Sequence, residues 1–195
     1  MKYEKLLMTF AIIAVLVAAV NLMVTLNKID LTGNVIGEAN LTIESRASID
    51  FISSVADWGS GTVDAGQTRA TLETDKSVQN GNWTDNVGPL VLENKGNTNV
   101  TLSLTISKNS TDFIGGTDPT FQLYINSSAN NVSCTVFSNF SNFTDVVDTD
   151  SRIICSDFNY LVGFDCIDFD FNITIYEDAL PEAKTVVLTA TAVPA

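Results

Sequence analysis

The side chains that could carry out chemistry in this chain are mainly carboxylates, since it has 23 Asp and Glu, 10 Lys and Arg, and no His. The lack of His excludes Ser-His-Asp and Cys-His nucleophile pairs and the usual His-bearing zinc and iron sites. No Ser-x-x-Lys motif and no glycine-rich phosphate loop is present. Among these catalytic arrangements, the composition permits only a pair of carboxylates of the kind that glycosidases use. We therefore expect a protein that is not an enzyme and has no catalytic residues.

Five acids in two segments have the oxygen-rich character that calcium prefers, an ion that takes about six to eight oxygen ligands. These candidates are Asp145, Asp148, Asp150, Asp168 and Asp170. The first three fall in one predicted loop and the last two on one face of a predicted strand, without EF-hand spacing. We favour a solvated acidic face over a calcium site, so no cofactor is expected. The net charge of −13 argues against nucleic acid as a partner.

The chain is rich in Asn-x-Ser/Thr sequons, which are acceptor sites for N-linked glycans. They occur at Asn40, Asn82, Asn99, Asn109, Asn126, Asn131, Asn139, Asn142 and Asn172. With 18 Asn and 38 Ser and Thr in 195 residues, chance would give about 3.5 sequons. Asn99 and Asn172 are expected on the outward faces of predicted strands, where a sugar has room. We expect several of these sites to be glycosylated.

Three cysteines permit one disulfide bond and one remaining thiol. Cys134 is in phase with Val132 and Val136, and Cys155 follows two isoleucines, so both have apolar surroundings. In the period-two pattern, Cys166 instead falls on the same strand face as acidic residues. We predict a Cys134–Cys155 disulfide, with Cys155–Cys166 as the alternative. In the first case Cys166 is either a free thiol or part of an intermolecular bridge.

These residues must be positioned by a chain that begins with an apolar stretch over residues 6–26. As a helix this stretch would be roughly 31 Å long, which matches the hydrocarbon core of a bilayer. Two lysines precede it and the next basic residue is Lys28, so residues 1–5 are expected in the cytoplasm and the rest outside. A cleaved signal peptide is the main alternative, although signal cores usually run only about 7 to 15 residues, and a pilin-type leader is a third and less favoured one. We predict a transmembrane helix over 6–26.

The segment of residues 27–38 contains two glycines and a modest alternation of Ile29, Leu31 and Val35 with polar residues. We interpret it as a tether between membrane and domain. The alternative is a strand that pairs with a sheet edge of this chain or of a neighbouring one. Residues 39–195 then form one extracellular domain, long enough to bury a core.

Beyond the tether the apolar pattern has period two almost throughout, which indicates short antiparallel strands. Residues 90–93 and 100–106 flank an Asn-Lys-Gly-Asn turn and predict a hairpin. Residues 167–176 and 185–193 flank an Asp-Ala-Leu-Pro turn and predict a second one. The predicted fold class is all-β: an antiparallel β-sandwich, immunoglobulin-like or jelly-roll, preceded by one N-terminal transmembrane helix.

Three segments of the chain resemble those of archaeal cell-surface β-sandwich proteins with an immunoglobulin-like fold. They are WGSGTVDAGQT, LVLENKGNTNVTLSLTI and IDFDFNITIYEDALPEAKTVVLTATA. The last differs from the family in having Glu182 and Ala183 where a Gly is usual. More distantly the layout is similar to camelysin-like fibre subunits and archaeal bundling pili. The resemblance implies the fold, a place on the cell surface and the Cys134–Cys155 pairing, but no active-site residues.

Together these features predict a membrane-anchored, glycosylated extracellular surface protein with a structural or adhesive role. One alternative is a secreted subunit of a fibre or pilus assembled by strand addition. Another is a glycan- or calcium-binding module, in which aromatic side chains such as Trp58, Trp83, Tyr124 and Tyr160 would form a sugar platform. The expected partners are the membrane through the N-terminal helix, other copies of the chain, or other surface proteins. The expected location is the cell membrane with the C-terminal domain outside, or a secreted state.

Overall fold

The computed structural model describes Tyr3, Met8 and residues 12–21, 41–127, 132–135, 137 and 139–195. The chain divides into two compact units, Met1–Ile43 and Glu44–Ala195. In the first unit, the described residues 12–21 are helical and expose their apolar side chains. Among the described residues no helix is both long enough and apolar enough to cross a membrane. The other residues of the predicted 6–26 span, apart from Met8, and the whole 27–38 segment lie outside the described residues.

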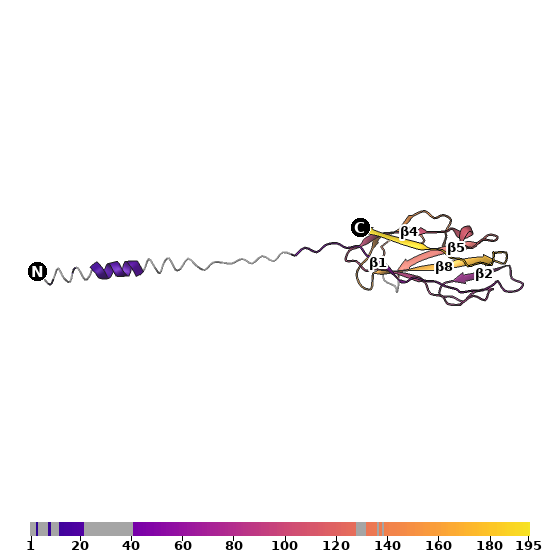
Figure 1. The fold of residues 1–195 in the computed structure, drawn as a ribbon, viewed down its shortest axis with the longest axis horizontal. Helices are drawn as coiled ribbons and strands as arrows, with labels where there is room; N and C mark the ends of the chain where they lie inside the picture. The colour runs from indigo at the N-terminus through magenta and orange to yellow at the C-terminus, as the bar shows by residue number, and fades with distance from the viewer. Residues whose placement is uncertain are drawn as a thin grey trace. The chain divides into compact units, whose positions relative to one another are not determined.

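The second unit consists of two antiparallel β-sheets (Figure 1). The larger sheet has the order β1-β3-β8-β5-β6, with β2 also paired to β8. Its strands are β1 (Ile49–Ser53), β2 (Arg69–Glu73), β3 (Leu90–Asn94), β5 (Thr120–Ser127), β6 (Thr144–Asp145) and β8 (Cys166–Tyr176). The smaller sheet has the order β7-β4-β9, with β7 (Arg152–Phe158), β4 (Val100–Ile106) and β9 (Leu188–Pro194). One short helix, α2 (Ser110–Phe113), follows β4. The predicted all-β, antiparallel, sandwich-like architecture is confirmed.

Strand β8 organises the larger sheet. It pairs with β5 along one side, from Ile167 to Thr174. Along its other side it pairs first with β3 and then with β2, so these two strands lie end to end beside it. Because it is paired on both sides, most of its backbone N–H and C=O groups are used by the sheet ladder. The strict alternation of its sequence therefore separates a buried face from a half-exposed one.

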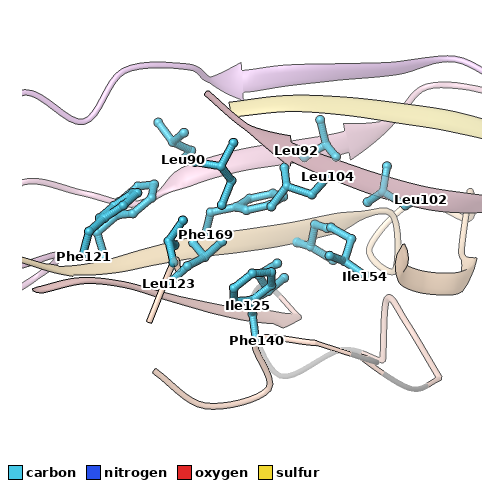
Figure 2. Close-up of a cluster of buried hydrophobic side chains, with 14 of the residues drawn as sticks. Leu90, Leu92, Leu102, Leu104, Phe121, Leu123, Ile125, Phe140, Ile154 and Phe169 are labelled. Carbon is cyan, nitrogen blue, oxygen red and sulfur yellow. The ribbon is translucent and has the colours of Figure 1, made fainter. Parts of the chain in front are cut away.

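The core lies between the two sheets, where alternate side chains of facing strands meet. Figure 2 shows Leu102 and Leu104 of β4 pointing into the same space as Phe121 and Leu123 of β5. Phe169 of β8 completes this cluster from the centre of the larger sheet. All five side chains are almost fully buried. Burying a side chain of this size contributes about 1.5 to 3 kcal/mol each, so this layer supplies the main stabilisation of the fold.

The two predicted hairpins are wrong in their pairing, although their strands are present. Strand β3 belongs to the larger sheet and β4 to the smaller one. Strand β8 likewise belongs to the larger sheet, while β9 pairs with β4. Each connection therefore crosses from one sheet to the other as an arch. A hairpin and an arch bury the same alternate residues of both strands, so the period-two pattern does not distinguish them.

Both chain ends of the second unit lie at one end of the sandwich, which we call the terminal pole. It comprises residues 44–48, the β3–β4 arch of residues 95–99, the β7–β8 loop of residues 159–165, and Ala195 (Figure 1). The register places them together, because Ile49 pairs with Asn94, Glu93 pairs with Cys166, and Val100 pairs with Phe158 and Pro194. The arch also binds the arriving chain: Arg46 N donates to Asn97 Oδ1 (2.6 Å) and Asn97 Nδ2 donates to Glu44 O (2.9 Å).

Candidate functional site

The half-exposed side of β8 forms an acidic face that points away from the core. Asp168, Asp170 and Asn172 lie on it at successive outward positions. On β5, Asn126 pairs with Asp168 and Tyr124 pairs with Asp170. The ring of Tyr124 lies 5.6 Å from that of Phe143. Carboxylates, amides and an aromatic pair on one surface are groups that can hydrogen-bond and stack on a polar ligand such as a sugar.

Asp170 is the most constrained residue of the acidic face. Thr74 Oγ1 donates to Asp170 Oδ1 (2.8 Å), and Asn126 Nδ2 donates to Asp170 Oδ2 (2.9 Å). Thr74 is buried and its hydroxyl also accepts from the N–H of Phe171 (3.1 Å). Burial raises the pKa of the Asp170 carboxyl, the charge of Asp168 raises it further, and the hydrogen bond from Thr74 opposes the rise. The carboxylate is therefore held in position at an electrostatic cost.

Replacing Asp170 by asparagine should change how stability depends on pH. The folded state binds the Asp170 proton more tightly than the unfolded state does, because the folded pKa lies above the ordinary value of 3.8. The contribution of this group to stability is thus greatest below pH 3.8 and is lost as the pH rises through the folded pKa. The free energy of unfolding of Asp170→Asn relative to wild type should therefore increase with pH over this range. Urea titrations of both proteins between pH 3 and 7 test this, and a difference that falls with pH would contradict it.

The five calcium candidates fall into two groups: Asp145, Asp148 and Asp150 line one pocket together with Arg152, and Asp168 and Asp170 lie on β8. Asp145 is on β6 in register with Gln122, and Asp168 and Asp170 are on β8. Asp148 forms an ion pair with Arg152 and its Oδ1 accepts from the N–H of Asp150 (3.2 Å). In the part of the chain that the structure describes, no three acidic or cysteine side chains gather into a group that could hold a metal ion. The fixed cation at Asp148 already neutralises that carboxylate.

The sequons differ in how they present the amide nitrogen that a glycan would occupy. Asn82 and Asn142 are exposed, and Asn109 is half-buried at the N-cap of α2. Their Nδ2 atoms make no hydrogen bond within the described residues, while Asn82 Oδ1 accepts from Thr62 N (2.6 Å) and Asn109 Oδ1 from Asp112 N (2.9 Å). Asn82 and Asn109 therefore present a fixed side chain with its amide nitrogen available, and Asn142 presents an exposed one. Asn109 follows β4 at the pole opposite the chain termini.

The other described sequons are less open. Nδ2 of Asn99, Asn126 and Asn139 donates to Asp157, Asp170 and the carbonyl of Ile153, respectively. Asn172 is half-buried in the central strand between β2 and β5. Asn99 is also half-buried, so the room expected around these two outward-facing residues is limited. Asn40 and Asn131 lie outside the described residues.

The predicted Cys134–Cys155 disulfide is confirmed. Both cysteines are buried, and Cys155 lies on β7 while Cys134 forms a bridge with Phe158 at the end of that strand. The segment around Cys134 follows β5 of the larger sheet, so the bond ties the exit of that sheet to the edge of the smaller one. Cys166 is the free thiol and is half-buried at the start of β8.

Cys166 should react slowly with alkylating reagents. Burial, the charges of Asp165 and Glu93, and a hydrogen bond to Asp165 raise the pKa of its thiol to about 11 from 9.0. At pH 8 the reactive thiolate should be about 100-fold less abundant than for a thiol of ordinary pKa. Timed iodoacetamide labelling between pH 7 and 10, with glutathione as the reference thiol, tests this. Labelling at the rate of glutathione would contradict it.

The four aromatic residues proposed as a sugar platform do not share a surface. Trp58 packs edge-on against Phe171 of the core (6.4 Å between ring centroids). Trp83 covers Gly61 and Gly81 so closely that a Cβ at either would lie within about 2.6 Å of its ring. Both indoles are thus part of the packing under the loops, while Tyr124 is on the acidic face and Tyr160 at the terminal pole.

Sequence reasoning missed two features of the terminal pole. The first is Asn94, which is 2% exposed and holds the arch, although it looks like an ordinary turn residue in sequence. The second is the β7–β8 loop, which exposes apolar side chains. The run Tyr-Leu-Val-Gly-Phe between Asn159 and Asp165 is a signal that could have revealed it, because apolar residues beside turn-forming ones are unusual in a surface loop.

Comparison of the chain with protein-family models, curated protein sequences and solved structures found no match. The assignment of function therefore depends on the chemistry and geometry of these residues.

Proposed function

We propose that this chain is an extracytoplasmic surface protein, held at the membrane by residues 6–26, with a structural or adhesive role. The observation that carries the proposal is the buried Cys134–Cys155 disulfide. Disulfides persist in oxidising surroundings outside the cytoplasm and are rare in reducing compartments. This bond closes a loop between two sheets of a β-sandwich, as in many secreted domains.

Three further features support the proposal. The chain has nine sequons, about two to three times the number expected by chance, and Asn82, Asn109 and Asn142 present an available amide nitrogen. The apolar stretch over 6–26 has the length and flanking lysines of a single-span anchor. The resemblance to archaeal surface β-sandwich domains points to the same location. An immunoglobulin-like or jelly-roll topology stays a prediction.

A secreted fibre subunit is the second candidate. It is favoured by the smaller sheet, in which β9 is an edge strand with no partner on its outer side among the described residues. An open strand edge can accept a strand from a neighbouring chain. In this case residues 6–26 would be removed as a signal peptide, and residues 29–35 would supply the added strand.

The test is to locate the chain in cells that express it in full. We expect it in the membrane pellet with residues 6–26 attached, cleaved by protease added to intact cells, and carrying glycans on at least one of Asn82, Asn109 and Asn142. Mass spectrometry of the shaved peptides measures all three properties. Protection from external protease together with reduced Cys134 and Cys155 would overturn the proposal. Release by shearing, as filaments whose subunit begins after residue 26, would favour the fibre.

Because of the acidic face, binding of a glycan or of calcium by this domain stays a further prediction. Binding on a glycan array that is lost in Asp170→Asn and Tyr124→Ala would support it. A blank array, together with a melting temperature unchanged by millimolar calcium, would remove it.

A further inference from the structure

The β7–β8 loop exposes four large apolar side chains within five residues, and the remaining residue is a glycine. We call Tyr160, Leu161, Val162 and Phe164 the apolar tip. Val162 is 93% exposed, Leu161 53% and Phe164 43%. Val132, also exposed, precedes Ser133, whose carbonyl accepts from the N–H of Asn159 at the start of this loop. In the described part of the second unit the other exposed large apolar side chains, such as Leu180, are not consecutive in sequence. The contiguous group marks this loop as an interaction surface.

The apolar tip is held in one conformation by the chain itself. Asn159 Oδ1 accepts from Leu161 N (2.9 Å), and Leu161 O accepts from Phe164 N (2.8 Å). This closes a turn with Gly163 at φ +87°, a conformation that favours glycine, and places Val162 at the outermost position. The buried Asp165 then joins the tip to the arch, because its carbonyl accepts from Asn94 N (2.8 Å). Because the loop is already ordered, binding through it costs little further conformational entropy.

The location of the tip indicates what it contacts. It lies at the terminal pole, where residues 44–48 enter the sandwich and are bound by the arch. The chain that precedes these residues, with its apolar stretch over 6–26, therefore reaches the domain at the pole that carries the tip. The carboxylate within the loop, Asp165, is buried rather than presented outward. At the same pole the side chain of Arg46 donates to the carbonyl of Lys95, and the Lys95 ammonium is ion-paired with Asp50 and Glu93. The three sequons with available amide nitrogens belong to other parts of the surface.

We infer that the apolar tip inserts into the surface of the membrane that anchors the chain and so holds the terminal pole against the bilayer. This inference rests on the proposed anchor. Leu, Val and Phe side chains partition into the interface, and the amphipathic ring of Tyr160 suits the headgroup level. Three partly inserted side chains bind weakly alone, but a tether raises their effective concentration at the bilayer to the millimolar range. Residues 27–43 could extend roughly 55 Å, so the covalent link by itself does not impose this contact.

The experiment places a tryptophan on the tip of the full-length chain and reports its depth in lipid. Val162→Trp is reconstituted in phosphatidylcholine vesicles with and without nitroxide-labelled acyl chains, and the wild-type signal of Trp58 and Trp83 is subtracted. Leu180→Trp, at an exposed single site of 69% exposure on the β8–β9 connection, is the matched control. We expect nitroxide lipids to quench Val162→Trp about twofold or more and to leave Leu180→Trp unchanged. Both sites are exposed, and an unchanged thermal unfolding curve verifies that the variants fold.

Flotation of the same vesicles in alkaline carbonate tests the anchor separately. Vesicles that retain the chain but leave Val162→Trp as unquenched as Leu180→Trp would overturn the inference and preserve the proposed anchor. If in those vesicles the tip instead cross-links to a second copy, its partner is another chain and the inference is again overturned. A chain that carbonate removes while Val162→Trp is still quenched would overturn the anchor and support lipid binding by the tip. A chain absent from the vesicles altogether would overturn both.

Discussion

Replacing Cys134 and Cys155 together by alanine should lower the free energy of unfolding by about 3 kcal/mol. The two cysteines are 21 residues apart, and the cross-link removes the closure entropy of that loop from the unfolded chain. The bond also joins the segment after β5 to β7, so its loss frees a connection between the sheets. For a domain of this size the melting temperature should fall by about 10 °C. Urea unfolding of oxidised wild type and of the double variant measures the difference.

The matched control for the disulfide is Cys166→Ala. It removes the third cysteine, which is half-buried and forms no disulfide, and should leave the free energy of unfolding almost unchanged. The double variant should also be insensitive to dithiothreitol, whereas wild type should lose a similar stability on reduction. If wild type unfolds at the same urea concentration with and without dithiothreitol, the disulfide contributes nothing and the prediction is wrong.

Replacing Asn94, the last residue of β3, by alanine should cost about 3 kcal/mol of unfolding free energy. Its Nδ2 donates to the carbonyls of Thr98 and Phe158 (both 3.1 Å), and its Oδ1 accepts from Gly96 N (3.0 Å). Alanine would remove these three hydrogen bonds to backbone groups, at about 1 kcal/mol or more for each. The Phe158 carbonyl belongs to the smaller sheet, so Asn94 bonds the two sheets where the chain crosses between them. Chemical denaturation monitored by tryptophan fluorescence measures the loss.

Asn97→Ala is the control for Asn94, since it removes the same kind of side chain from the arch that directly follows β3. Asn97 is exposed, and its bonds to residues 44 and 46 hold the arriving chain rather than the two sheets. We expect a loss below about 1 kcal/mol, because water replaces the bonds of an exposed amide. If Asn94→Ala and Asn97→Ala lose the same unfolding free energy, then the burial of Asn94 between the two sheets adds nothing to its contribution.

Much of the fold could be predicted from local patterns. The strict alternation of residues 100–106 and 167–175 identified β4 and β8 and their buried faces, because burial of one face imposes period two. The same reasoning selected Cys134 and Cys155, whose apolar neighbours indicate a shared buried environment. The prediction for Asn172 was partly right: its side chain points outward, but flanking strands on both sides leave it half-buried.

The sequence alone indicated most of the strands and the faces they bury, favoured the Cys134–Cys155 pair, and showed an acidic, sequon-rich composition, but it did not indicate β6 or β7. Only the tertiary structure decided which strands share a sheet, since β3 pairs with β1 and β8 rather than with the adjacent β4. It also decided that Asn94 is buried, that Thr74 and Asn126 hold Asp170, and that the apolar tip lies where the chain arrives. The physical reason is that periodicity reports burial along one strand. Pairing, hydrogen-bond partners and the gathering of loops at one pole depend on contacts between residues far apart in the chain.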